Sequence, residues 1–327
     1  MTSAASNASD NPQDTTTEAV PKKIVVLTTG GTIACTHAPG GELLPTVSGE
    51  ELVAPVRARF ESTGVDIVVR ELNRMDSSSM TFADIDEIVE AVHDALDDED
   101  VTGVVVTHGT DSMEETAVAV DTFHNDPRPV IFTGAQHSFD HPQADGPGNL
   151  FEAIVIAGDS SARDIGALIV FGHAVIPARG ATKWHTSDEL AFATNGPEEP
   201  TRPDPIAPHK LADVRVDIVH AYAGASGDVV DALVEAGSQG LVVEAMGSGN
   251  VGSAMGAALA RAMDKDIPVV ISTRVPRGEV YGAYGGAGGG ATLKAKGATG
   301  STYMRSPQAR VLLAIAIATG HHPATLF

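Results

Sequence analysis

Two short clusters of glycine and hydroxyl or acidic residues follow apolar segments of the chain. Thr32 comes after a pair of glycines, and Thr110 and Asp111 come after a single glycine. Glycine lets the main chain turn sharply and lets a ligand approach closely, and exposed amides there can hold an anion or an oxyanion. A threonine hydroxyl in such a place could act as a nucleophile, and a carboxylate beside it could bind an ammonium group. Each cluster also has a purely structural interpretation, because Gly-Gly-Thr often forms only a turn and Asp111 or Ser112 would cap a helix.

A lysine further along the chain could supply a proton acceptor. Lys183 lies in the segment 178–186, which reads Ala-Arg-Gly-Ala-Thr-Lys-Trp-His-Thr. If the fold holds its amine against a carboxylate and a threonine, the amine could accept or relay a proton from a hydroxyl nucleophile. A lysine near a loop is more often solvated surface, so the interpretation depends on where the fold carries this residue.

Cofactor chemistry has one candidate segment. Residues 247–252 have the GxGxxG spacing of a dinucleotide-binding loop, after one apolar run and before a helical pattern. The acidic residue expected about 20 positions later is missing, and Arg274 stands there, which could fit a 2′-phosphate. An NADP-dependent oxidoreductase therefore stays open as a second hypothesis, although only about 50 residues follow Arg274. The 12 histidines show no metal-ligand spacing such as HExxH, so we predict no metal site.

The elements that must position these residues alternate between strand and helix patterns. Short β-branched apolar runs alternate with apolar residues at helical spacing. This alternation predicts a mainly parallel sheet covered by helices on both faces, and ligands bind such sheets beyond the carboxyl ends of the strands. We expect strands at 24–28, 65–69, 104–107, 130–133, 168–171, 216–220, 241–244 and 268–272, and helices at 85–96, 113–123, from about 149, 229–236, 251–263 and 308–318.

Composition divides the chain into four parts. Residues 1–21 are rich in Ser, Thr, Asn and Asp without an apolar run, which predicts a disordered tail rather than a signal peptide. Residues 22–196 form a larger α/β domain, and residues 197–213 form a Pro-rich linker. Residues 214–327 form a smaller α/β domain, so the predicted fold class is α/β with two domains. The glycine-rich patch 282–290 predicts a mobile loop.

The charge balance limits the partners. Asp and Glu total 43 against 21 for Lys and Arg, a formal net charge of -22, which would repel nucleic acid and anionic lipid. A salt-adapted proteome would also give this balance. No segment approaches the ~20 apolar residues of a membrane span. The one cysteine, Cys35, fits a reducing compartment, so we predict a soluble cytoplasmic protein.

Taken together, the motifs resemble the bacterial-type L-asparaginase family, which includes glutaminase-asparaginases. The resemblance extends from residue 22 to residue 327, and residues 76–80 are closer to the cytoplasmic branch than to the secreted one. The segments that carry it occur in the family's order: 29–34, 107–116, 145–149, 182–183, 195–197, 247–250, 274–276 and 308–312.

The resemblance implies a hydrolase that converts L-asparagine to L-aspartate and ammonia without a cofactor. It implies that Thr32 is the nucleophile that forms an acyl-enzyme. It also implies that Thr110, Asp111 and Lys183 form a second catalytic group. A glutaminase-asparaginase with a broader substrate range is the alternative within the family, and a non-catalytic amino-acid-binding protein of the same fold is a third hypothesis.

The resemblance also implies substrate contacts and an assembly. Asp111 and Ser77 are similar to residues that bind the α-ammonium and α-carboxylate groups of the substrate. Ser78 falls where some members carry a glutamine that touches the substrate. Family members are typically homotetramers of close dimers, and Asn250 resembles a residue that a neighbouring subunit contributes to the site.

Three features depart from the family pattern or from its relatives. Many members have a tyrosine on the loop after the first threonine, but residues 34–48 contain none, so Thr46 or Ser48 would stand in or the mechanism would rely on Lys183. The partner glutamate of many secreted members corresponds to the glycine-rich loop, with Glu279 nearby but out of register. A relative within a tRNA-dependent amidotransferase carries an extra N-terminal domain, for which the 28 residues before Thr29 are too few.

Overall fold

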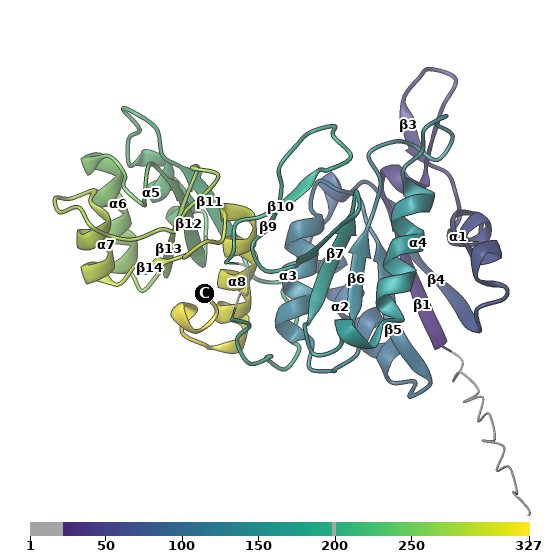
Figure 1. Cartoon of the computed structure of the whole chain (residues 1–327). Helices are drawn as coiled ribbons and strands as arrows, with labels where there is room; N and C mark the ends of the chain where they lie inside the picture. The colour runs from purple at the N-terminus through teal and green to yellow at the C-terminus, as the bar shows by residue number, and fades with distance from the viewer. Residues whose placement is uncertain (1–21, 198–200) are drawn as a thin grey trace, which may run out of the picture.

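The computed structural model describes residues 22–197 and 201–327. The tail predicted over residues 1–21 lies outside these ranges, as do residues 198–200 of the predicted linker. Within these ranges, the chain forms two α/β units, each built around its own main sheet, and one helix is packed between them (Figure 1). The predicted α/β fold class is confirmed.

The larger sheet is mainly parallel, and the first strand of the chain lies in its interior. Only its last strand runs antiparallel to its neighbour. The order is β4 (Val65–Met75), β1 (Lys22–Gly30), β5 (Val101–Thr107), β6 (Val130–Thr133), β7 (Ala167–Phe171) and β8 (Ala174–Pro177). Alternate residues of the inner strands pack on opposite faces. Val25 and Leu27 join a core with helices α2 (Phe82–Leu96) and α3 (Met113–Phe123), while Ile24 and Val26 join a core with α1 (Gly49–Arg57) and α4 (Gly146–Ala157).

The smaller sheet is entirely parallel. Its order is β11 (Val216–His220), β12 (Gly240–Ala245), β13 (Val269–Thr273) and β14 (Thr299–Gly300). Leu241 and Val243 face a core with α5 (Asp228–Glu235), α6 (Ser253–Met263) and α7 (Gly290–Lys296). Val242 faces α8 (Ser306–Thr319), which also packs on α3 of the larger unit. One apolar core is therefore continuous across both units, and α8 lies between them in Figure 1.

The periodicity predicts the long elements well and misses the short ones. The strands at 130–133 and 216–220 and the helix at 113–123 have the predicted bounds. Helix α1 was missed because it is short and contains Pro55; a capping box between Ser48 and Glu51 begins it. Two short antiparallel pairs were also missed, β2 (Cys35–His37) with β3 (Leu43–Pro45) and β9 (Ala181–Lys183) with β10 (Phe192–Thr194). Each short pair depends on contacts that local sequence patterns do not reveal.

The Pro-rich segment that follows the larger unit is bonded along that unit. Arg202 forms an ion pair with the buried Asp121 of α3 at 3.0 Å. The Leu211 amide donates to the carboxylate of Asp86 in α2 at 2.9 Å. Residues 201–213 thus form neither helix nor strand but run as a fixed strap over α2 and α3.

Three strand ends of the larger sheet meet through glycine. Gly31 follows β1 with φ +77°, and a Cβ added there would lie 2.4 Å from the Cα of Gly109, which follows β5. A Cβ on Gly109 would in turn lie 2.5 Å from the Oγ of Ser77, which follows β4. Contact this close excludes any side chain at either glycine. The residues that follow these strands are therefore held at one place.

We expect Gly31→Ala to destabilise the fold far more than a glycine change without a neighbour. Gly41→Ala is the matched control, because Gly41 also has a positive φ, +92°, but meets nothing within 4 Å. The control should lose about 1–2 kcal/mol of unfolding free energy from backbone strain alone. Gly31→Ala should lose at least about 2 kcal/mol more, because its Cβ overlaps the main chain of Gly109 and because its φ of 77° and ψ of -179° form a conformation that suits glycine alone. Urea unfolding of both variants measures the difference, and equal losses would show that the contact is not a constraint.

Candidate active site

The candidate site lies where the strand order of the larger sheet reverses. The chain passes from β1 to β4 on one side and to β5 on the other, so the carboxyl ends of these strands flank a topological switch point. Ligands bind open parallel sheets at such points. Thr28 of β1 pairs with Thr107 of β5, so Thr32 and Thr110 follow the two strands at nearly the same height. Thr32 is half-buried and begins the short 3-10 helix Thr32–Ala34.

Lys183 reaches the same place from the β9–β10 pair. Its ammonium lies 2.8 Å from Thr110 Oγ1 and 2.8 Å from Asp111 Oδ1. Thr110 is buried, and the lysine side chain is 22% exposed, so this lysine is not a solvated surface residue. An ammonium can only donate, so Thr110 accepts from Lys183 and its own hydroxyl proton is available to another group.

Ser77 joins the cluster from the end of β4. Its Oγ accepts a hydrogen bond from the Asp111 amide at 3.1 Å, and its carbonyl accepts one from the Ser112 hydroxyl at 2.7 Å. Ser112 occupies the N-cap position of α3 but makes no side-chain cap bond, because its hydroxyl is used on Ser77. Ser77 is buried, whereas Ser78 beside it is exposed. The fold thus brings together Ser77, Thr110, Asp111 and Lys183 beside Thr32, and leaves Ser78 at the edge.

A buried histidine supports the glycine that precedes Thr110. The Nδ1 of His108 lies 2.7 Å from the Gly109 carbonyl, and its Nε2 lies 2.8 Å from the Thr116 hydroxyl. Because a carbonyl only accepts, Nδ1 carries the proton and Nε2 accepts from Thr116. Burial lowers the pKa of His108 to about 4, so the ring is neutral near neutral pH. His108 thus supports the structure around Gly109. It belongs to the motif at residues 107–116, but the motif did not indicate this role.

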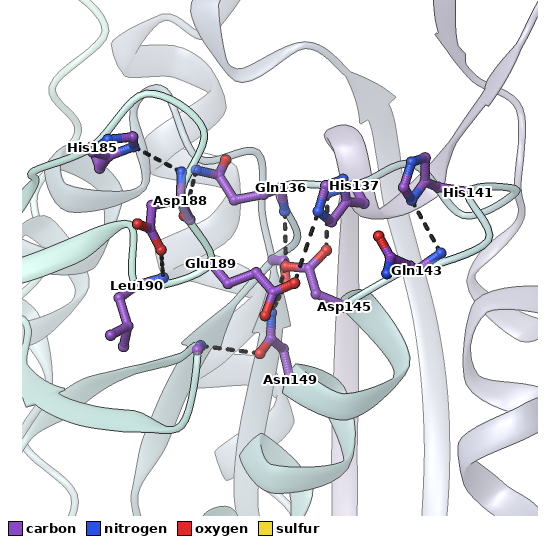
Figure 2. Close-up of polar contacts among 12 residues, drawn as sticks. Gln136, His137, His141, Gln143, Asp145, Asn149, His185, Asp188, Glu189 and Leu190 are labelled. Atoms are coloured by element: carbon purple, nitrogen blue, oxygen red, sulfur yellow. Dashed lines mark hydrogen bonds and ion pairs between the residues drawn. The ribbon is translucent and has the colours of Figure 1, made fainter.

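Asp145 and Asn149 anchor the loop after β6 to this end of the sheet. The Asp145 carboxylate accepts from the amides of Gln136 and His137, each at 2.9 Å, and from Asn149 Nδ2 at 3.1 Å. Figure 2 shows these bonds together with the bond from the Gln136 side chain to the Asp188 carbonyl, 2.9 Å long. Asp188 belongs to the turn between β9 and β10, so the network also ties down the hairpin that carries Lys183.

Glu114 and Gln308 are site residues to which sequence reasoning assigned no role. Glu114 is buried on the first turn of α3, and its Oε2 accepts from the Lys183 amide at 2.6 Å. Burial raises the pKa of Glu114 to about 7, although bonds from Lys183 and Thr182 oppose this. The available signal was the spacing, since Glu114 stands one helical turn after Asp111.

The other candidate residues have different surroundings. Asn250 lies in the smaller unit, where its Oδ1 accepts from the Gly290 amide at 3.1 Å. It lines a hollow of about 310 Å³ with the loop 284–289, and no other predicted site residue lines this hollow in the described chain. Thr46 pairs with the Thr36 hydroxyl at 2.7 Å, and Ser48 caps α1. Neither Thr46 nor Ser48 is thus placed in the cluster by its hydrogen bonds.

The Gly247 loop is poorly shaped for a dinucleotide. It is a tight turn closed by the Met246–Asn250 bridge. The glycine-rich segment covers the start of α6, because Gly288 accepts from the Val251 amide at 2.9 Å and a Cβ on Gly288 would overlap Val251. A pyrophosphate would need this helix N-terminus to be open. The predicted α6 start at 251 was two residues early for the same reason, since Val251 bonds outside the helix.

The ranges that the structure describes, 22–197 and 201–327, contain neither a cluster of metal-ligating side chains nor a membrane-spanning helix. No three His, Cys, Asp or Glu side chains in them are grouped so that they could hold a metal ion. No helix there is long and apolar enough to cross a membrane.

Comparison with known proteins places both units in one family. Residues 23–202 match the model of the asparaginase N-terminal domain, and residues 215–326 match that of the glutaminase/asparaginase C-terminal domain. The chain is 31% identical to an L-asparaginase of Bacillus licheniformis, over 91% of this chain and 96% of that protein. It is 32% identical to a probable L-asparaginase of Deinococcus radiodurans, over 91% and 94%. The crystal structure of a probable cytoplasmic L-asparaginase from Campylobacter jejuni superposes with a TM-score of 0.80 at 26% identity, covering 93% of this chain and 98% of that one.

The raised pKa of Glu114 predicts a pH effect on stability. A carboxyl with a folded-state pKa of about 7 and an ordinary value of 4.5 binds its proton more tightly in the folded chain. This contribution is complete below pH 4.5 and is lost as the pH rises to about 7. As the pH rises from 4.5 to about 7, the wild type should lose about 3 kcal/mol of unfolding free energy that Glu114→Gln keeps. Urea unfolding over a pH series measures the gain. The exposed Glu61→Gln control should follow the wild type, and a Glu114→Gln curve parallel to both would contradict the prediction.

Proposed function

This chain belongs to the asparaginase family, and we propose that it hydrolyses L-asparagine to L-aspartate and ammonia through an acyl-enzyme on Thr32. The observation that carries the proposal is the position of the Lys183 amine, 2.8 Å from both Thr110 Oγ1 and Asp111 Oδ1, at the strand ends beside Thr32. A hydroxyl nucleophile, a relay hydroxyl and an amine in one place are what acyl transfer from an amide requires.

The proposed reaction has two steps. Thr32 Oγ attacks the side-chain amide carbon of asparagine, and main-chain amides near Thr32 and Thr110 hold the oxyanion. The group formed by Thr110, Asp111 and Lys183 takes up the Thr32 proton through the Thr110 hydroxyl, and it returns a proton to the leaving nitrogen, which departs as ammonia. Water then attacks the ester, and its proton takes the same route while the Thr32 hydroxyl is restored and aspartate leaves. No cofactor or metal takes part.

The substrate's α-groups have proposed partners in the same cluster. The exposed carboxylate of Asp111 is assigned to the α-ammonium group, and Ser77 is assigned to the α-carboxylate. Ser78, exposed at the edge, is a weaker contact. Because no glutamate corresponds to the one that secreted members bring from a partner, we infer a preference for asparagine over glutamine. Ammonia release from L-asparagine, L-glutamine and D-asparagine, measured side by side, ranks these substrates and also separates hydrolysis from an NADP-dependent or binding-only role.

We also infer that the enzyme is a cytoplasmic homotetramer of close dimers. The name of the Campylobacter jejuni relative and the single cysteine, Cys35, support the compartment. The separation of Asn250 from the Lys183 cluster within one chain supports the assembly, because its proposed substrate contact would then be made in a neighbouring subunit. Helix α6 exposes the small side chains of Ser253, Ala254 and Ala257, which permit close helix packing between subunits.

Thr32→Ala is expected to lose several orders of magnitude in turnover while keeping its melting temperature. The variant removes the proposed nucleophile, which no neighbouring group replaces. Thr102→Ala is the matched control, since Thr102 lies at the opposite end of β5, where its hydroxyl accepts from the Lys23 amide. Ammonia release measures both variants. A folded Thr32→Ala enzyme with more than about a tenth of the wild-type rate, an effect below ~1.4 kcal/mol, would exclude Thr32 as the nucleophile.

A mixture of two inactive variants tests the shared site. Thr32→Ala and Asn250→Ala chains, unfolded together and reassembled, should form mixed dimers that regain one intact site each. Their ammonia release should exceed that of both parents. Mixed dimers confirmed by mass but without recovered activity would mean that each subunit builds its site alone.

A further inference from the structure

Lys183 is held at two points by the beginning of one helix. Asp111 lies just before α3 and bonds the lysine ammonium at 2.8 Å. Glu114 lies one turn later on the same side and accepts the lysine's main-chain amide at 2.6 Å. Lys183 therefore spans the two acceptors, with its main-chain amide on Glu114 and its ammonium on Asp111. Both ends of the residue are therefore fixed relative to α3.

The burial of Glu114 needs a compensating interaction. Transferring a carboxylate from water into a protein interior is costly unless it is paired or hydrogen-bonded. Its side chain accepts from Lys183, and the Thr182 side chain also lowers its pKa. Both groups belong to β9. The helix N-terminus adds a favourable partial positive charge, which makes this turn of α3 a suitable place for an anion.

Gln308 of α8 fixes the other parts of this arrangement. Its Nε2 donates to the Glu114 carbonyl at 3.1 Å and to the Ala178 carbonyl at 2.6 Å, and its Oε1 accepts from the Gly180 amide at 2.8 Å. Gln308 is buried, so all three bonds are shielded from water. The turn that leads into β9 is thus tied to the same helix that receives Lys183.

We propose that Glu114 is a positioning residue that holds the Lys183 main chain so that the lysine amine reaches Thr110 and Asp111. This inference rests on the proposed role of Lys183 in proton transfer. Glu114 touches neither Thr32 nor the substrate; it acts through the lysine. This role requires an acceptor oxygen at the distance that a glutamate side chain spans, and it does not require a negative charge.

The charged groups around Glu114 come from several elements. Lys183 faces it from β9, and Glu115 follows it on α3 and pairs with Arg310 of α8 at 3.1 Å. Further charges line the cavity of about 530 Å³ to which Glu114 and Lys183 also contribute: Glu244, Arg274 and Arg305. A variant that shortens the side chain but keeps its charge therefore tests the position of the acceptor oxygen separately from the electrostatic effect of these charges.

Kinetics of two Glu114 variants test the geometric requirement. Glu114→Asp keeps the charge but withdraws the acceptor by one methylene, and should lower kcat for asparagine at least about tenfold with KM within about threefold. Glu114→Gln keeps an oxygen at the same reach and should stay within about threefold of the wild type in both constants. Glu115→Ala, on the same turn but bonded to Arg310, is the control and should also stay near wild type. Lys183→Met is the reference for complete loss of asparagine turnover. Wild-type kcat in Glu114→Asp beside an inactive Lys183→Met enzyme would overturn the proposal.

Nuclear magnetic resonance of protein labelled with 15N-lysine gives a readout that needs no activity. The Lys183 amide resonance should shift with pH in the wild type, with a midpoint near 7, as the carboxyl that it contacts ionises. In Glu114→Gln this titration should vanish. A wild-type Lys183 amide that does not respond to pH would overturn the contact itself. This result is separate from the proposed function, which fails if the wild-type enzyme releases no ammonia.

Discussion

Main-chain contact between Gly31 and Gly109 sets the distance between the ends of β1 and β5. The residues that follow these strands are held at a fixed separation, because the two glycines leave no room for side chains and Ser77 packs against Gly109. Thr32 and Thr110 are placed by the turns that leave these glycines. A second contact, from Lys183 to Thr110 and Asp111, then brings a distant hairpin to the same point. The site is thus built by strand ends first and completed by long-range hydrogen bonds.

Helix α8 makes this arrangement depend on the whole chain. It packs on α3 and on the smaller sheet, and its Gln308 bonds the Lys183-bearing segment to α3. The smaller unit therefore supports the cluster around Lys183 in its own chain through α8. Separate expression of residues 22–196 would remove this helix together with its apolar contacts.

How much the sequence predicts depends on the range of the interactions involved. The alternation of buried strands and amphipathic helices predicts the parallel sheets, and the rule that ligands bind at strand ends selects Thr32, Thr110 and Asp111. The arrival of Lys183 is not predicted by local pattern, because β9 and β10 are three residues each and are positioned by contacts with α3 and α8. The sequence offered Lys183 as a possible proton acceptor, and the family resemblance assigned it to the site. Glu114 has the pattern of an ordinary acidic residue in the first helical turn. Its spacing from Asp111 was the available signal, but its burial and its bond from the Lys183 amide depend on contacts between distant segments. Helix α1 was missed because Pro55 interrupts its pattern.

In the proposed reaction, the acyl group of the substrate passes through Thr32 at this strand-end cluster. Rapid acid quench of the enzyme during turnover of asparagine, followed by mass spectrometry of the digested chain, would detect this intermediate. We expect an aspartyl ester on the peptide that contains Thr32, present in the wild type and absent from Thr32→Ala. An ester on the peptide that contains Thr110 would contradict the assignment of the nucleophile. Full turnover in single-cycle experiments without any ester would contradict the acyl-enzyme itself.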